Sequence, residues 1–189
     1  MRVERTVTIQ RPIEEVFEYL ATPENDPTWA PAIRSHERSS PGPIGVGTRT
    51  RMELSLLGRT ATYDWEVTEY ETPRLLAYRT TSGPLPATVR FRLVPVDGGA
   101  ATGLSHAVET EPRGVYYRAL ASLMPTAIGR ILEGMLGNLK DRLEGKPATA
   151  SREPGAAPSG AMVVGAIVVA AVAVASLLLL RRRRRSSKR

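Results

Sequence analysis

Several consecutive segments between residues 32 and 110 alternate apolar and polar residues, and turns rich in glycine or proline separate them. Tyr63 and Trp65, for example, alternate with Asp64 and Glu66. Because side chains two residues apart share a face of a strand, this pattern predicts strands with one apolar and one solvated face. Such strands are typical of an antiparallel sheet. The expected strands cover residues 3–10, 32–40, 48–57, 60–71, 75–81, 87–96 and 101–110.

Two segments have helical spacing instead. Residues 11–20 place apolar side chains at intervals of three and four, with Pro12 near the expected start. Residues 118–144 carry a long apolar stripe, in which Pro125 is expected to start, kink or split the helix. The predicted order is a strand, a short helical segment, six strands and a long helix. A broad apolar helix laid across a curved antiparallel sheet gives an α+β fold of two layers.

The segment "VTIQRPIEEVFEYLATPENDPTWAP" resembles the opening of the START-like polyketide cyclase/dehydrase and lipid-transport superfamily, also called SRPBCC. The segments "GPIGVGT", "YDWEVTEYETPRLLAYRT" and "LGNLKDRLE" resemble the same family, so the resemblance covers residues 3 to about 145. It implies a helix-grip fold, in which a curved antiparallel sheet wraps around a long C-terminal helix and encloses an elongated apolar cavity. The run "DGGAATGLSHAVE" departs from the family's usual turn before the last strand, which leaves the pairing of that strand open.

The cavity implied by the resemblance is where we expect function, because apolar pockets with a few polar groups are the usual ligand sites. The candidate ligand-binding residues are Met52, Leu54, Tyr63, Trp65, Tyr78, Phe91 and His106 from the strands, with Ile128 and Leu132 from the helix. For the aliphatic members, a purely structural place in the core is the stronger alternative. Tyr63, Tyr78 and His106 are better candidates, because a buried hydroxyl or imidazole needs a polar partner that a ligand could supply.

No residue is assigned a catalytic role from the sequence. His106 is the one titrating group expected on the inner face, and an isolated core histidine is more often structural than catalytic. General acid–base catalysis also requires a partner within hydrogen-bond reach, and none is evident. Asp64 and Glu66 are expected on the solvated face as surface charges. No cofactor or metal site is expected, since the chain has no cysteine and two histidines.

Trp29 lies among Pro23, Pro27 and Pro31, in a segment expected to form a compact, irregular turn between the first helix and the second strand. We expect its ring to pack as a hydrophobic anchor near one end of the cavity. A structural role is therefore favoured over a ligand contact.

The C-terminal part has a different composition from the predicted domain of residues 1–145. Residues 146–160 are rich in proline, alanine, glycine and serine, which predicts a flexible linker. Residues 161–180 are twenty consecutive residues without a charge or a proline, long enough for one transmembrane helix. A buried core helix is the weaker alternative. Small residues spaced four apart in this span are compatible with weak homodimer formation.

The basic tail at residues 181–189 contains seven of the 26 lysine and arginine residues. The preceding 180 residues therefore contain 19 basic and 19 acidic residues, so nucleic acid is not an expected partner of the domain. We expect the tail to lie among membrane lipid head groups. The positive charge of the tail favours a cytoplasmic C-terminus, which would place the domain outside the cell. The lack of a signal sequence favours the opposite orientation, with the domain in the cytoplasm. The expectation adopted is a single-pass protein of the cell membrane with its domain in the cytoplasm.

These features predict a membrane-tethered protein that binds or transfers a small hydrophobic ligand, such as a lipid, an isoprenoid or quinone, or a polyketide-like molecule. Tethering would raise the concentration of the cavity near molecules dissolved in the bilayer. Two alternatives stay open: an enzyme of the polyketide cyclase or dehydratase type, and a non-catalytic interaction module. The family resemblance alone is a weak argument for a particular chemistry.

Overall fold

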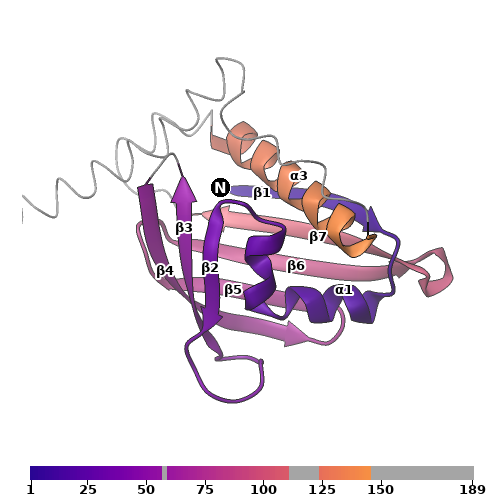
Figure 1. Ribbon diagram of the computed structural model, residues 1–189, viewed down its shortest axis with the longest axis horizontal. Coiled ribbons are helices and arrows are strands. Elements are labelled where there is room, and N and C mark those ends of the chain that lie inside the picture. The colour runs from indigo at the N-terminus through magenta and orange to yellow at the C-terminus, as the bar shows by residue number, and fades with distance from the viewer. Residues whose placement is uncertain (57–58, 111–123, 146–189) are drawn as a thin grey trace, which may run out of the picture.

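Seven strands form one antiparallel sheet in the order β1-β7-β6-β5-β4-β3-β2 (Figure 1). The structure is a computed structural model of the 189-residue chain and describes residues 1–56, 59–110 and 124–145. The strands are β1 (Arg2–Ile9), β2 (Ile33–Arg38), β3 (Arg49–Leu56), β4 (Arg59–Glu71), β5 (Leu75–Ser82), β6 (Ala87–Val96) and β7 (Ala101–Thr110). The predicted α+β order, with six strands between the first helix and the last, is confirmed.

The helices lie between β1 and β2 and after β7, with one short 3-10 helix between β6 and β7. They are α1 (Ile13–Leu20), the 3-10 helix η1 (Pro23–Thr28), the 3-10 helix η2 (Asp97–Gly99) and α3 (Met124–Leu143). Helix α1 follows Pro12, and Glu14 and Glu15 stand in its first turn, where acidic side chains complement the helix dipole. Its apolar stripe is buried, including Val16 and Phe17. The predicted amphipathic helix is therefore present.

The segment expected to be an irregular turn is a 3-10 helix instead. Pro23 begins η1 and Pro27 lies inside it. Pro23 is tolerated at the start of η1, because the amide groups of the first turn have no partner within the helix. The turn brings Trp29, directly after η1, into the core with 1% of its surface exposed. The predicted packing of this ring in the hydrophobic core is confirmed.

Strand β4 carries two register shifts against β5, at Asp64/Trp65 and at Val67/Glu69. Such bulges bend a strand and increase the local twist of a sheet. In a flat sheet, β2 and β5 would lie about 14 Å apart, three strand spacings. The rings of His36 on β2 and Tyr78 on β5 nevertheless have centroids 6.2 Å apart. The sheet therefore curls into a half-barrel, and its concave side is called the inner face below.

Helix α3 and the first helical segment lie on the inner face of the curled sheet (Figure 1). Leu136 and Leu139 of α3 join the main hydrophobic core. The Asn138 side chain donates a hydrogen bond to the Trp29 carbonyl oxygen at 3.1 Å, which fastens α3 to the segment after η1. Arg5 of β1 pairs with Glu133 of α3 at 2.7 Å. These contacts close the two-layer fold.

The described part of the long helix is Met124–Leu143, and Pro125 lies at its N-terminal end. The remainder of the predicted stripe, residues 118–123, lies outside the described residues. Strand β7 pairs along its length with both β1 and β6, which answers the question left by the atypical turn before it. The fold class is confirmed for the described domain.

Within the ranges that the structure describes, no helix is long and apolar enough to cross a membrane. The linker, the predicted transmembrane span and the basic tail all lie outside those ranges. They remain predictions from the sequence.

Candidate functional site

The predicted ligand-binding residues come from strands of the inner face and from α3. Met52, Trp65, Tyr78, Phe91, His106 and Leu132 are buried, and Leu54, Tyr63 and Ile128 are partly buried. The strand residues other than His106 belong to the main core or pack against it. On α3, the residues that join this core are Leu136, Leu139, Met135 and Leu143, which lie beyond the predicted Ile128 and Leu132 along the helix. The structure thus gathers the predicted strand residues at the inner face.

His106 lies on β7 at the centre of an aromatic group on the inner face. Its ring stacks on Phe91, with centroids 4.4 Å apart and planes at 29°, and Trp29 meets it edge-on at 6.5 Å. Neither ring nitrogen of His106 has a hydrogen-bond partner, although the residue is 2% exposed. Burial lowers the pKa of His106 to about 3, so the imidazole is neutral at physiological pH. A neutral imidazole offers one donor and one acceptor.

The two tryptophans extend this set of unpartnered groups. The indole nitrogens of Trp29 and Trp65 are buried and make no hydrogen bond. A buried polar group without a partner costs roughly 1–3 kcal/mol relative to a satisfied one. Trp65 stands directly opposite Thr50 on β3 and opposite Thr80 on β5, so its side chain shares the inner face with both. An indole is a donor only. The Trp29 indole acts on the Asp26 carboxyl group, whereas Trp65 has no acceptor.

A second polar group on the inner face is fully connected. Nδ1 of His36 lies 2.6 Å from Oδ2 of Asp26, and Nε2 lies 2.7 Å from Oγ1 of Thr50. In the tautomer with its proton on Nδ1, His36 donates to the Asp26 carboxyl oxygen, and the Thr50 hydroxyl donates to Nε2. His36 is 5% exposed, and 16% of the Asp26 side chain is exposed. This trio, Asp26, His36 and Thr50, is called the polar cluster below.

The polar cluster is electrostatically linked to neighbouring side chains. Burial raises the pKa of Asp26, whereas its hydrogen bond with His36 lowers it. The Trp29 indole also lowers the pKa of Asp26, although its nitrogen is not placed to form a regular hydrogen bond. The pKa of Tyr78 is raised by burial first and by the negative charge of Asp26 second. Asp26 is therefore electrostatically coupled to the interior as well as to His36.

The position of His106 was predicted from the sequence, whereas the polar cluster was not. Ile33 and His36 are both buried although they are three residues apart, which simple alternation forbids. A register shift between Ile33 and Ser35 in the pairing of β2 with β3 supplies the extra residue. After Ile33, the segment "RSHER" has no apolar residue that would mark its buried face. Asp26 comes from η1, which alternation along a strand cannot place.

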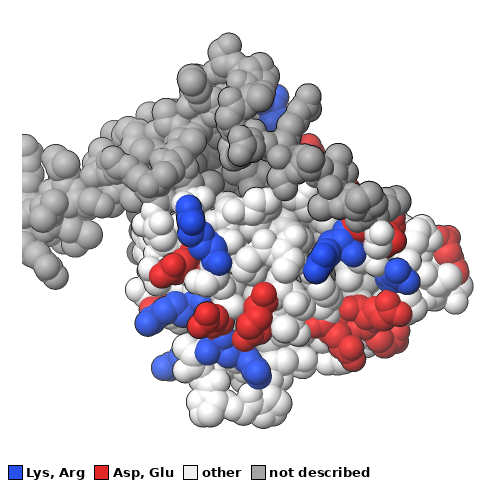
Figure 2. Space-filling model, in the orientation of Figure 1, with Lys and Arg blue, Asp and Glu red and all other residues white. Residues whose placement is uncertain are grey.

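The carboxylate of Asp64 lies on the solvated face, as expected. It forms an ion pair with Arg51 of β3 at 2.8 Å, and both groups retain substantial exposure. In the view of Figure 2, acidic and basic side chains are mixed across the described surface, and acidic side chains gather over α1. The pairing explains Asp64 as surface charge.

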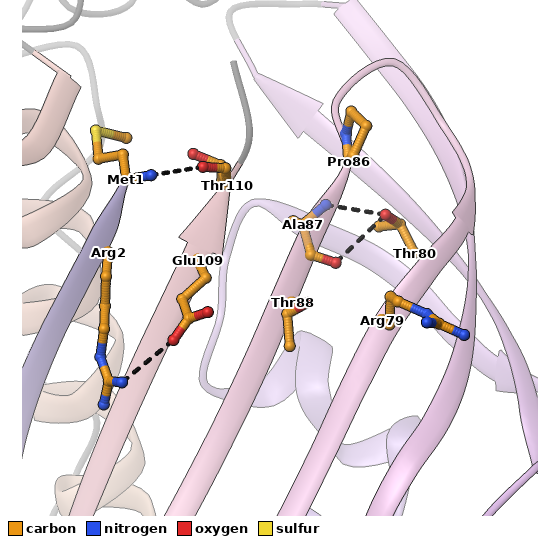
Figure 3. A pocket seen from close by; sticks show the side chains of 9 residues that line it. All are labelled: Met1, Arg2, Arg79, Thr80, Pro86, Ala87, Thr88, Glu109 and Thr110. Atoms are coloured by element: carbon orange, nitrogen blue, oxygen red, sulfur yellow. Dashed lines mark hydrogen bonds and ion pairs between the residues drawn. The ribbon is translucent and has the colours of Figure 1, made fainter. Parts of the chain in front are cut away.

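A pocket of about 370 Å³ lies at the end of the sheet where β5 and β7 end and β1 and β6 begin (Figure 3). Its lining residues are Met1, Arg2, Arg79, Thr80, Pro86, Ala87, Thr88, Glu109 and Thr110. Arg2 and Glu109 form an ion pair at 3.2 Å on its wall. The hydroxyl of Thr110 is buried and has no hydrogen-bond partner. The pocket thus combines charged groups with an unsatisfied polar atom.

The strand register relates this pocket to His106. Ala87 and Thr110 are paired residues of β6 and β7 in the pocket, and Phe91 and His106 are paired four residues further along. Four residues along a strand span about 13 Å. Because residues at even spacing share a face, the row from Thr110 to His106 follows the inner face. The pocket and the aromatic group therefore lie at two points of one row.

The sequence profile of the family described as "Polyketide cyclase / dehydrase and lipid transport" matches residues 1–144. Among curated proteins, no sequence matches the chain significantly. Many solved structures resemble the domain. One, the protein TTHA0849 from Thermus thermophilus, has a TM-score of 0.65 and 18% identity, and the match covers 77% of this chain and 98% of that chain.

Two further structures have descriptions that name a class of protein. A START superfamily protein from Mycobacterium smegmatis matches with a TM-score of 0.64 and 19% identity, over 76% of this chain and 97% of that one. The Zhui aromatase/cyclase from a Streptomyces species matches with a TM-score of 0.61 and 20% identity, over 76% of this chain and 93% of that one. At these identities the likeness establishes the fold alone.

Proposed function

This chain belongs to the polyketide cyclase/dehydrase and lipid transport family, and we propose on that premise that it binds or transfers a small hydrophobic ligand. The ligand is held between the inner face and α3, in contact with Tyr63, Tyr78 and His106. Candidate ligands are a lipid, an isoprenoid or quinone, or a polyketide-like molecule. A shared fold does not determine a shared function, so the proposal is argued from the side chains that line the inner face.

The observation that carries the proposal is the aromatic interior with unsatisfied polar groups. Trp29, Phe91 and His106 form one contacting set of rings. Both ring nitrogens of His106 and the indole nitrogen of Trp65 are buried without partners. Native proteins satisfy most buried polar groups, so several together in an apolar interior favour a bound molecule that supplies the missing hydrogen bonds.

Purified residues 1–145 provide the direct test. The protein is extracted with organic solvent, and the extract is analysed by mass spectrometry beside that of a His106→Trp variant, designed to fill the interior. The expected result is a hydrophobic compound enriched in the wild-type extract at near-stoichiometric amount. An empty wild-type protein that also binds no fluorescent lipid or quinone would contradict ligand binding.

The tether is the second part of the proposal. Residues 161–180 anchor the domain in the cell membrane, and the basic tail of residues 181–189 contacts the head groups. The apolar run and the flanking arginines support this part. A reporter that is active only outside the cell, fused after residue 189, should be active if the domain is cytoplasmic. A chain recovered in the soluble fraction would contradict the anchor, and an inactive reporter on a membrane-bound chain would contradict the orientation.

One observation favours an enzyme of the polyketide cyclase or dehydratase type as the second candidate. His36 and Asp26 are an acid–base pair within hydrogen-bond reach, and the His36 ring lies 6.2 Å from the ring of Tyr78. Under this alternative, the domain converts a poly-β-keto thioester into a cyclised aromatic product. The product pattern should then change in the Tyr78→Phe and His36→Gln variants. An unchanged pattern in a folded Tyr78→Phe variant would remove that residue as a catalyst.

A further inference from the structure

We propose that the loop between β2 and β3, residues 39–48, is a membrane-contact loop whose apolar tip inserts among anionic lipid head groups. This inference rests on the proposed membrane anchor, and it identifies the face of the domain that turns toward the bilayer. The predicted linker covers residues 146–160. A stretched chain of that length spans about 50 Å, more than the diameter of a domain of this size. The tether alone therefore leaves the orientation of the domain open.

The tip of this loop is apolar and exposed. Residues 39–48 have the sequence "SSPGPIGVGT", which contains no charged residue. Val46 is 69% exposed, the highest value among the exposed large apolar side chains of the described ranges. Pro41 and Pro43 are exposed as well. The loop projects from the lower end of the molecule in Figure 1, and the same region of Figure 2 shows no charged side chain.

The two other exposed large apolar side chains in the described ranges have charged neighbours. Val94, 50% exposed, shares the outer face of β6 with the exposed Arg92. Ile131, 42% exposed, directly follows the exposed Arg130 on α3. Single apolar side chains among charges are ordinary on protein surfaces. The uncharged β2–β3 loop differs from them, and exposed apolar patches of this kind mark interaction sites.

Hydrogen bonds and packing hold the loop in this shape. The Gly47 amide donates to the Val67 carbonyl oxygen at 2.8 Å, and the Val67 amide donates to the Thr48 carbonyl oxygen at 2.9 Å. Ile44, inside the loop, packs against the main hydrophobic core. Val46 is therefore presented outward by an ordered loop. An ordered loop loses little conformational entropy when it makes a contact.

The backbone of the tip is also suited to a place with little water. Each backbone polar group that loses its water without gaining a partner costs free energy. Pro41 and Pro43 have no N–H group to satisfy. The Gly42 carbonyl oxygen between them accepts a hydrogen bond from Nη1 of Arg38 at 3.0 Å. The tip thus exposes fewer unpaired backbone groups than the same loop without prolines would.

Two arginines stand at the base of the loop, one on each strand. Arg38 ends β2 and Arg49 begins β3, and both are exposed. Among the described residues neither forms an ion pair, although Glu37 is adjacent to Arg38 and Glu66 stands opposite Arg49 on β4. A guanidinium binds phosphate oxygens through paired hydrogen bonds. The two arginines, called the basic collar below, therefore match the anionic head groups that would surround an inserted tip.

Contact at this loop would turn one end of the inner face toward the bilayer. His36 on β2 and Thr50 on β3 both lie close to the loop along the chain, and both belong to the polar cluster. A hydrophobic ligand leaving the membrane would then meet the domain at the polar cluster.

A fluorophore attached to the tip tests this contact directly. The chain has no cysteine, so a single introduced cysteine is labelled selectively. Val46→Cys carries an environment-sensitive fluorophore in the full chain, reconstituted into vesicles of phosphatidylcholine and phosphatidylglycerol with and without a spin-labelled lipid. Val94→Cys is the matched control, because it replaces another exposed valine on β6. We expect the spin-labelled lipid to quench the label at position 46 at least about threefold more than at position 94.

The outcomes separate this inference from the proposed function. Quenching at position 46 no stronger than at position 94, on a membrane-bound chain, would overturn the membrane-contact loop and leave the anchor and ligand binding intact. A chain recovered outside the vesicles would contradict the anchor, and the inference with it. Circular dichroism checks that the labelled proteins fold, and Pro43→Cys provides a second position on the same tip.

The basic collar is tested by lipid charge. Arg38→Gln combined with Arg49→Gln should reduce quenching at position 46 at least about twofold in vesicles that contain phosphatidylglycerol, and change it little in phosphatidylcholine alone. Arg92→Gln removes an exposed arginine from β6 and should leave the quenching unchanged. Equal quenching with and without the two arginines in the anionic vesicles would refute the role of the basic collar.

Discussion

His36 and His106 are the two histidines of the chain, and both are buried on the inner face of the sheet. Both ring nitrogens of His36 have partners within 2.7 Å, whereas neither nitrogen of His106 has any. Burial is therefore similar for the two side chains, and the hydrogen bonding differs. A satisfied buried imidazole stabilises its surroundings, while an unsatisfied one costs free energy that a ligand can recover. This difference in hydrogen bonding is why the proposed ligand contact is placed at His106.

The largest expected effect is on stability in acid. The pKa of His106 is lowered to about 3 in the folded protein from an ordinary value of 6.5, so the unfolded chain binds a proton first as the pH falls. Between pH 7 and pH 4 the wild type should therefore lose about 3 kcal/mol more stability than His106→Phe does. Urea unfolding of both proteins at each pH measures this. Asp26, whose pKa is raised, acts in the opposite direction in both proteins and cancels in the comparison. Parallel pH profiles would contradict a neutral, buried His106.

The next effect is on the satisfied histidine at neutral pH. His36→Phe removes the partner of Asp26 and of Thr50 at once, and should lower the free energy of unfolding by about 2 kcal/mol or more. Thr50→Val is the control, because it removes one of the two hydrogen bonds and should cost about half as much. A His36→Phe variant as stable as the wild type would show that the polar cluster contributes no stability.

The smallest effect is expected from the same substitution at the other histidine. His106→Phe at neutral pH breaks no hydrogen bond within the described domain and should change the free energy of unfolding by less than about 1 kcal/mol. It should nevertheless weaken binding of naphthoquinone, since a donor is lost. Unfolding and binding curves for the same preparation provide both values. A large loss of stability would mean that His106 is an ordinary satisfied core residue.

The fold could be predicted because its signals are local. Alternation in each strand and helical spacing in two segments depend on residues close in sequence, and the order of the elements followed from them. The position of His106 was predictable for the same reason, since Leu104 and His106 alternate within one regular strand. The inward direction of Phe91 was predictable in the same way.

The remainder of the site depends on irregularities. The bulge in β2 turns His36 inward against the alternation, and the curl of the sheet brings it to Tyr78 on a strand three positions away. Asp26 contacts His36 from η1, a 3-10 helix in a segment whose prolines predicted an irregular turn. The indole nitrogen of Trp65 lacks a hydrogen-bond acceptor because of how the surrounding side chains pack, and no sequence pattern predicts this.

The chain has two tryptophans, and both indoles lie against the inner face. Its ultraviolet emission therefore originates in the interior, next to the proposed ligand position, and not at the surface. The fluorescence of either indole should be quenched by an electron-accepting quinone bound nearby. Because the same two rings are exposed to water on unfolding, their emission should shift to longer wavelength when the domain opens. The domain thus carries an intrinsic optical reporter for both occupancy and folding, with no label added.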